Sequence, residues 1–154
     1  MKKIEIIDVT LKRLSEEREV SLLFREKSAI ASSADLLGAD VIELPIIKNF
    51  REDAIIYKTI SQKVQNATLA IPVGFDKEGV ATAWECVKFA KNPRLQIEVP
   101  VSTIQMEYTY HVKQEKMLLK IGELVKEAKT YCESVEFSAL DATRASIYFL
   151  VSAV

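Results

Sequence analysis

The chain has 154 residues, which is long enough for a single domain to bury a sizeable core. Apolar residues make up 49% of it and charged residues 28%, a composition typical of a globular protein rather than a disordered one. Its 21 basic and 22 acidic residues give a net charge of −1, which removes the electrostatic argument for binding nucleic acid or an anionic membrane surface.

The cysteines and the first residues indicate the cellular compartment. Cys86 and Cys132 are too few and too far apart for a disulfide framework or a zinc motif, so we expect two small buried hydrophobic side chains. The start, Met1-Lys2-Lys3, leads into a strand pattern with no apolar segment long enough for a signal peptide or a membrane span. The expected location is the cytoplasm.

Short runs rich in Val and Ile predict the β-strands. They lack the strict polar alternation of a half-exposed sheet, which favours parallel strands buried on both faces. The predicted strands are residues 3–9, 40–44, 67–72, 95–101 and 134–138.

Helical patterns fill the segments between these strands. Gly38 follows the first of them, where a left-handed cap would fall, and Asn92-Pro93 stops the third. The predicted helices are residues 23–37, 51–64, 77–91 and 113–131, with a fifth beginning near Thr143.

Strand and helix alternate throughout, which predicts right-handed crossovers and a parallel sheet. Each unit takes about thirty residues, as in a (β/α)₈ barrel. A closed barrel needs eight strands and this pattern supplies five, so we expect either a fragment of a longer protein or a half-barrel that pairs its open edges. The fold class predicted is α/β, a single partial TIM-type barrel domain over residues 1–154.

Four segments carry a family resemblance: Asp8-Val9-Thr10-Leu11, Gly38-Ala39-Asp40-Val41-Ile42-Glu43, Ser102-Thr103-Ile104-Gln105, and the run from Val135 to Arg144 that reads VEFSALDATR. They resemble the acyl-CoA condensing and cleaving enzymes, namely isopropylmalate synthase, homocitrate synthase and hydroxymethylglutaryl-CoA lyase. The resemblance implies a TIM-type barrel with metal-assisted Claisen or aldol chemistry at the carboxyl ends of its strands.

The departures from the family pattern lie where that resemblance places the chemistry. The family follows its first strand with Arg, which steadies an enolate oxygen, and Asp, which binds a divalent metal; here these positions are Lys12 and Arg13. Arg has no lone pair to give a metal. Gln105 replaces a substrate-contacting His, and Leu140 replaces a pocket Glu. The family's two remaining metal ligands, a His-x-His pair, would lie beyond residue 154, and His111 matches no ligand position.

Three features leave alternatives open. Lys12 and Arg13 form either a cationic site for a carboxylate or an acyl-CoA phosphate, or a solvated pair at the start of a polar loop that runs to Glu19. Glu43 acts either as an acid or base with a raised pKa, or as the partner of Lys12 in a structural salt bridge. Asp141 suits a helix cap, where its carboxylate would accept the first free amides.

The sequence therefore predicts a degenerate homologue of these enzymes that lacks metal-dependent catalysis and needs no cofactor. Whether it is an enzyme stays open. Lys12 is the candidate catalytic residue, and the candidate binding residues for a small carboxylic acid or acyl-CoA are Arg13, Glu43, Gln105 and Ser138. The alternative is an active acyltransferase or carbon–carbon lyase whose rearranged metal site a longer chain completes. We expect a homodimer or a partner subunit to cover the open sheet edges.

Overall fold

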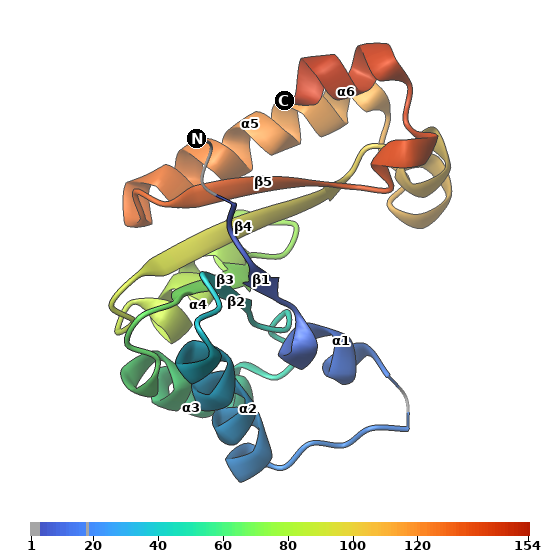
Figure 1. Cartoon of the computed structure of the whole chain (residues 1–154). Helices are drawn as coiled ribbons and strands as arrows, with labels where there is room; N and C mark the ends of the chain where they lie inside the picture. Colours follow the sequence, from blue (N-terminus) through green and yellow to red (C-terminus); the bar gives the residue numbers. More distant parts are fainter. Residues whose placement is uncertain (1–3, 18) are drawn as a thin grey trace.

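The computed structural model describes residues 4–17 and 19–154, which form a curled parallel sheet with helices packed along its outer side (Figure 1). The strands are β1 (Ile7–Asp8), β2 (Val41–Glu43), β3 (Thr68–Pro72), β4 (Pro93–Pro100) and β5 (Val135–Leu140). The helices are α1 (Thr10–Glu16), α2 (Phe24–Leu37), α3 (Phe50–Lys63), α4 (Lys77–Val87), α5 (Gln114–Tyr131) and α6 (Ile147–Ala153).

The strands lie in the sheet in chain order, and each described pair is parallel. Helices α2, α3, α4 and α5 follow one another around the outside, each in contact with the next. A sheet wound in one direction, with its crossover helices on one face, is the geometry of a TIM-type barrel. The chain therefore forms a half-barrel, as the α/β pattern predicted.

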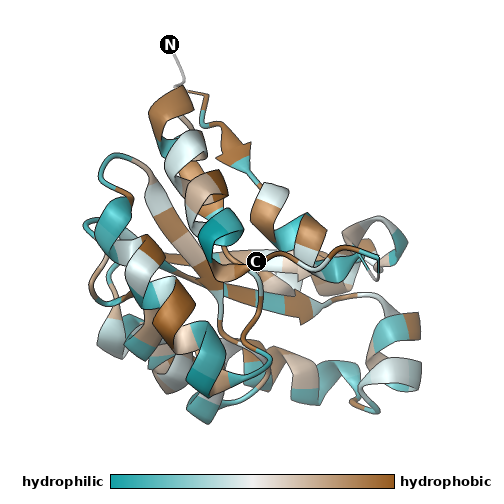
Figure 2. Ribbon diagram, turned by 90° about the horizontal axis from the view of Figure 1, so that it is seen from below, coloured by the Kyte–Doolittle hydropathy of each residue, from teal (hydrophilic) through white to brown (hydrophobic). Residues whose placement is uncertain are grey.

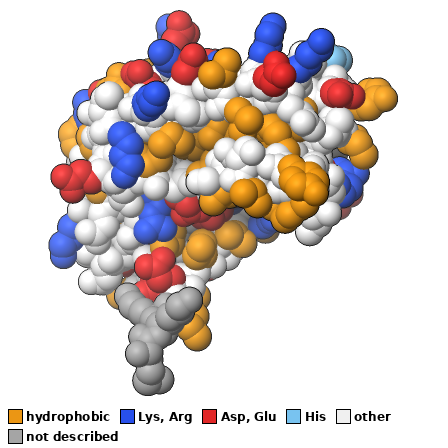
Figure 3. Space-filling model, turned by 90° about the horizontal axis from the view of Figure 1, so that it is seen from above, with side chains coloured by type: hydrophobic (Ala, Val, Ile, Leu, Met, Phe, Trp, Pro, Cys, Tyr) orange, Lys and Arg blue, Asp and Glu red, His pale blue; other side chains and the backbone are white. Residues whose placement is uncertain are grey.

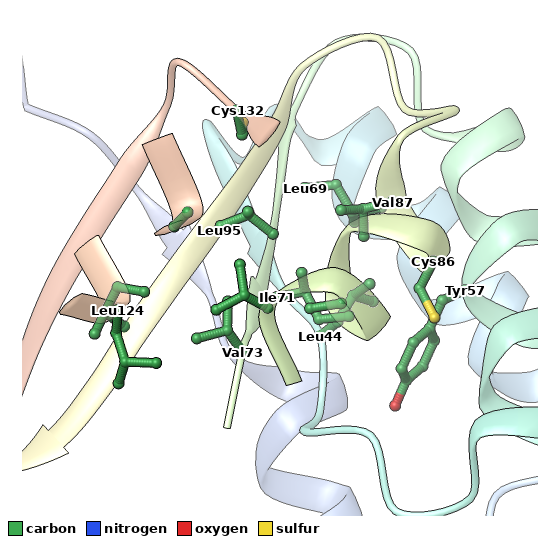
Figure 4. Close-up of a cluster of buried hydrophobic side chains, with 14 of the residues drawn as sticks. Leu44, Tyr57, Leu69, Ile71, Val73, Cys86, Val87, Leu95, Leu124 and Cys132 are labelled. Carbon is green, nitrogen blue, oxygen red and sulfur yellow. The ribbon is translucent and has the colours of Figure 1, made fainter. Parts of the chain in front are cut away.

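The core lies between the sheet and these helices (Figure 4). Leu69 and Ile71 of β3 and Leu95 and Ile97 of β4 are fully buried there. Burying an aliphatic side chain of this size contributes about 1.5–3 kcal/mol, so this layer supplies much of the folding free energy. Figure 2 shows the same division, with largely hydrophobic strands and hydrophilic residues at intervals along the helices.

Most predicted elements are confirmed within a few residues of their predicted ends. Gly38 closes α2 with φ of +86°, in the left-handed conformation expected of it. Cys86 and Cys132 are buried free thiols, as predicted. Helix α4 ends earlier than the predicted residue 91, because Ala90 N–H turns back to the carbonyl of Val87 and the chain passes directly into β4.

The start of the chain differs from the prediction. Of the strand predicted over residues 3–9, residue 3 lies outside the described residues and only Ile7–Asp8 pairs with β2. The predicted polar loop after Lys12 is wrong up to residue 16, because α1 begins at Thr10. The Asp8 carboxylate accepts the Thr10 backbone N–H and hydroxyl, both at 3.1 Å, and this turn ends the strand and starts the helix. Arg18 of the predicted loop lies outside the described residues.

The segment after β5 also differs. A short 3₁₀ turn (Ala142–Arg144) precedes α6, which begins at Ile147 instead of near Thr143. The predicted capping role of Asp141 is wrong, because its carboxylate accepts no backbone amide in the described chain. Asp141 has a left-handed backbone (φ of 60°), which turns its side chain toward the Ser102 hydroxyl and Arg144.

Candidate functional site

The concave face of the half-barrel is polar along β4 and β5. Gln96 lies opposite Glu136, and Glu98 lies opposite Ser138. Successive side chains of a strand point to opposite faces. The residues between them, such as Leu95 and Ile97, therefore pack against the helices, while the polar residues line the inside. The predicted lack of polar alternation is wrong for these two strands.

Lys12 reaches this concave face from α1. Its ammonium nitrogen lies 2.7 Å from Glu43 Oε2, forms a second ion pair with Glu98, and lies 3.4 Å from Gln96 Oε1. The Lys12 side chain is only 14% exposed. Three strand-borne acceptors from β2 and β4 thus converge on one cation at the carboxyl end of the sheet, which confirms the predicted pairing of Lys12 with Glu43.

The polar contacts continue down the face. Gln96, 1% exposed, donates its amide to Glu43 Oε1 and to Glu136 Oε1, each at 3.0 Å. Glu136 in turn binds Arg94 Nη1 at 3.2 Å. We call this set, Lys12, Glu43, Gln96, Glu98, Glu136 and Arg94, the inner network. It holds three carboxylates and two cations, so its formal charge is −1.

Lys12 is charged at neutral pH. Burial alone would lower its pKa, but the hydrogen bonds and opposite charges of Glu43 and Glu98 outweigh the burial and raise the pKa above its usual value. The geometry thus fixes a permanent positive charge between two carboxylates.

The other predicted site residues lie in different surroundings. Arg13 is on the solvent side of α1, 72% exposed, with Nη1 3.0 Å from Glu16 Oε2. Ser138 is half-buried on the concave face, beside Glu98 in register. Gln105 is half-buried at the start of a π-helical turn (Gln105–Thr109) after β4. The structure therefore brings Lys12, Glu43 and Ser138 to one face and leaves Arg13 outside it.

A second polar cluster lies where the chain leaves β4 and β5. The Ser102 hydroxyl donates to Asp141 Oδ2 and accepts the Gln105 backbone N–H at 3.3 Å. Arg144 Nε donates to Asp141 Oδ1 at 2.7 Å. The hydrogen bonds from Arg144 and Ser102 hold the pKa of Asp141 below its usual value. This cluster fixes the start of the turn that carries Gln105.

The carboxylates at the barrel mouth are held by a cation of the chain itself. Among the described residues, no three His, Cys, Asp or Glu side chains gather as metal ligands. Both carboxylates at the mouth bind the Lys12 ammonium, and Arg13 offers no lone pair. His111 is exposed, with a left-handed backbone, just after the π-helical turn.

Sequence reasoning missed Gln96, Glu98 and Glu136. The signal was present, because polar residues alternate with apolar ones from Arg94 to Val99. The prediction of strands buried on both faces left this alternation out of account.

The chain matches the HMGL-like family over residues 3–154 and belongs to that family. The proteins similar to it include 2-isopropylmalate synthases from Clostridium kluyveri (36% identical, 97% of this chain and 29% of the relative) and Ruminiclostridium cellulolyticum (34%, 98% and 30%). The enzyme of that name from Halalkalibacterium halodurans is 30% identical over 100% of this chain and 30% of its own length.

The chain thus spans about 30% of the length of the curated relatives it matches. The predicted family resemblance is confirmed. In the part of the chain that the structure describes, no helix has the length and apolar character needed to cross a membrane.

Proposed function

We propose that this chain is a degenerate member of the family that lacks metal-dependent condensation and binds a small carboxylic acid or an acyl-CoA at the barrel mouth. The observation that carries the proposal is the placement of Lys12 between Glu43 and Glu98. An ammonium there supplies positive charge to the mouth from within the chain and engages the carboxylates that a metal would need.

The charges suggest how an acid would bind. Lys12, Glu43 and Glu98 together carry −1, so an incoming carboxylate must replace one of the two glutamates on the ammonium. Glu98 is the better candidate, because its side chain is 18% exposed and that of Glu43 10%. The Ser138 hydroxyl beside Glu98 would then donate to the ligand, and Gln105 would contact it from the adjoining turn.

This exchange predicts opposite effects for two variants. Glu98→Gln removes the competing charge, so 2-oxo acids should bind it more tightly than wild type, by about tenfold for one favourable ion pair regained. Lys12→Met should abolish binding, whereas Lys126→Met on α5 should bind as wild type does. Isothermal titration calorimetry with pyruvate, 2-oxoisovalerate and acetyl-CoA measures the affinity of each variant and of wild type. Equal affinities for the Glu98 and Lys12 variants would contradict the exchange.

A second candidate is an active acyltransferase or carbon–carbon lyase, completed by a longer chain. It is favoured by one observation, that the chain spans about 30% of its 2-isopropylmalate synthase relatives. Lys12 would then steady an enolate oxygen, with metal ligands supplied by further strands.

Two measurements separate these candidates. Elemental analysis of the purified protein after incubation with Mn²⁺ gives the metal content, and acetyl-CoA-dependent thiol release with 2-oxo acids gives turnover. We expect substoichiometric metal and no thiol release. Stoichiometric metal accompanied by turnover would establish the enzyme and refute the degenerate assignment.

We also propose that a second copy or a partner subunit covers the sheet edges. β1 and β5 each pair on one side only among the described residues, and unpaired strand edges are sites of association. Exposed apolar side chains accompany them, including Ile6 next to β1 and Ile147, Tyr148 and Val151 on α6. Figure 3 shows hydrophobic side chains gathered on the face seen from above. Light scattering after size exclusion should give a mass above one chain; a monomer at every concentration would refute the pairing.

A further inference from the structure

A cavity of about 180 Å³ lies between α1, the segment that follows it, the loop after β2, and helices α2 and α3. It shares no residue with the inner network. The residues that line it are Leu14, Ser15, Val20, Ser21, Leu22, Lys27, Pro45, Ile46, Lys48, Asp53 and Tyr57.

Tyr57 of α3 is a buried residue whose hydroxyl opens onto this cavity. The residue is 2% exposed, and its hydroxyl has no hydrogen-bond partner within residues 4–17 and 19–154. Every fully enclosed side-chain nitrogen or oxygen of the described residues does have a partner, so this hydroxyl must open onto the cavity that Tyr57 lines. Figure 4 shows the hydroxyl pointing away from Cys86. Because it opens onto the cavity, the hydroxyl is free to donate a hydrogen bond to a molecule that enters.

The two lysines of the cavity have no carboxylate partner in the part of the chain that the structure describes. Lys27, half-buried on α2, makes no ion pair in the described chain. Lys48, an exposed residue after β2, donates through Nζ to the carbonyl of Ser15 at 3.2 Å, which keeps it beside the cavity, and it makes no ion pair among residues 4–17 and 19–154.

The one carboxylate in the lining is already occupied. Asp53 Oδ2 accepts the backbone N–H groups of Lys48 at 2.8 Å and Asn49 at 3.0 Å, so it holds the start of α3. Burial and the charge of Asp53 raise the pKa of Tyr57, so the hydroxyl is a donor throughout the neutral range. The lining therefore offers two cations and a phenol donor to an anion that enters the cavity.

We propose that this cavity binds a compact oxyanion, a phosphate or a small dicarboxylate, through Lys27, Lys48 and the Tyr57 hydroxyl. A cavity of this size suits such an anion. The site is independent of the function proposed for the barrel mouth.

The test measures melting temperature and binding heat against inorganic phosphate and malonate, with sodium chloride at matched ionic strength. We expect at least one of the two oxyanions to raise the melting temperature saturably and chloride to do so weakly. A phosphate-only or malonate-only response supports the site and identifies the source of the anion. Phosphate also stabilises proteins by exclusion from the surface, but that effect does not saturate and does not depend on two lysines.

Three variants make the assignment specific. Lys27→Met/Lys48→Met should lose the saturable response, whereas Lys126→Met should keep it. Tyr57→Phe should bind about tenfold more weakly, because the phenol donor has been removed. Without anion, its melting temperature should stay close to that of wild type. The proposal is overturned if no saturable response occurs or if the lysine double variant keeps it. Lys12→Met should keep the saturable response to the oxyanion. A failure of the function proposed for the barrel mouth can therefore be distinguished from a failure of the anion site.

Discussion

The two faces of the sheet are stabilised by different interactions. On the helix side, β3 and β4 present aliphatic side chains such as Ile71 and Ile97, fully buried against α4 and α5. On the concave side, the neighbouring residues Gln96 and Glu98 join Lys12 in a chain of hydrogen bonds and ion pairs. The first face is held by apolar burial, which tolerates exchange of similar volumes. The second depends on complete pairing, because each member left alone is a buried charge or amide.

This difference separates folding from function in the half-barrel. An apolar layer against helices stabilises the family's scaffold whatever its chemistry. Charged groups on the concave face contribute little net stability when paired and cost a great deal when unpaired. Their presence is therefore better explained by the site they form than by the stability they add.

Replacing one charged residue of the inner network should give the largest loss in the free energy of unfolding. Lys12→Met leaves Glu43 and Glu98 facing each other without a counter-ion, and we expect a loss of about 3–5 kcal/mol in the free energy of unfolding. Adding Glu98→Gln should recover part of it, because the loss comes from uncompensated charge. Urea unfolding at pH 7 measures both. A double variant no more stable than the single one would show that the pair does not behave as a charge network.

The pH dependence of the wild-type protein's stability follows from the same ion pairs of Lys12. The pKa of Lys12 is raised in the folded state, so its contribution to stability is fully present below its ordinary pKa of 10.5 and is lost as pH rises through the folded value. Lys12→Met should lack this alkaline loss. The midpoints of urea unfolding, compared between pH 9 and pH 11.5, reveal this loss. If the midpoint fell equally with pH in both proteins, Lys12 would not be the cause of the alkaline loss.

On the helix side, truncation should follow cavity energetics instead. Ile97→Ala removes a fully buried side chain between β4 and the helices, and we expect a loss of about 2–4 kcal/mol. Ile97→Val, the matched control, should cost about 1 kcal/mol. Because no charge is involved, both losses should be independent of pH between 5 and 11. If the loss in the free energy of unfolding varied with pH, the helix side could not be described as held by apolar burial alone.

Asp35 tests a polar contact on the helix side. Its carboxylate accepts the backbone N–H groups of Gln65, Asn66 and Ala67 at 3.0, 3.0 and 2.7 Å, which joins α2 to the start of β3. Burial alone would raise its pKa, but these hydrogen bonds outweigh it and hold the pKa below the ordinary 3.8. Asp35→Asn should cost about 1–3 kcal/mol at pH 7.

The contribution of Asp35 to stability depends on pH in the opposite direction to that of Lys12. A depressed carboxyl pKa gives stability that is present above 3.8 and lost as pH falls through the folded value. The gap between wild type and Asp35→Asn should therefore narrow below about pH 4. A constant gap from pH 7 to pH 3 would mean that the carboxylate charge contributes nothing.

The fold was predictable because its signals are local. Gly38 and Asn92-Pro93 mark element ends, and the segment from Val135 to Arg144 matches the family pattern. The site was predictable only where a family motif marked it, as for Lys12 and Glu43. The polar alternation within β4 indicates that Gln96 faces inward, but it does not show which residues Gln96 contacts. The cavity that Tyr57 lines is formed with residues far along the chain, which spacing within one helix does not show.

The smallest expected effect belongs to Arg13, the neighbour of Lys12 in sequence. The two cations are adjacent on α1, yet the side chain of Arg13 is 72% exposed and that of Lys12 14%. Exposed pairs such as Arg13–Glu16 contribute at most about 0.5 kcal/mol, so Arg13→Ala should unfold almost as wild type does. It should also bind 2-oxo acids unchanged. If Arg13→Ala weakened binding as much as Lys12→Met, the ligand would have to contact the outer side of α1, and the concave face would no longer be the binding surface.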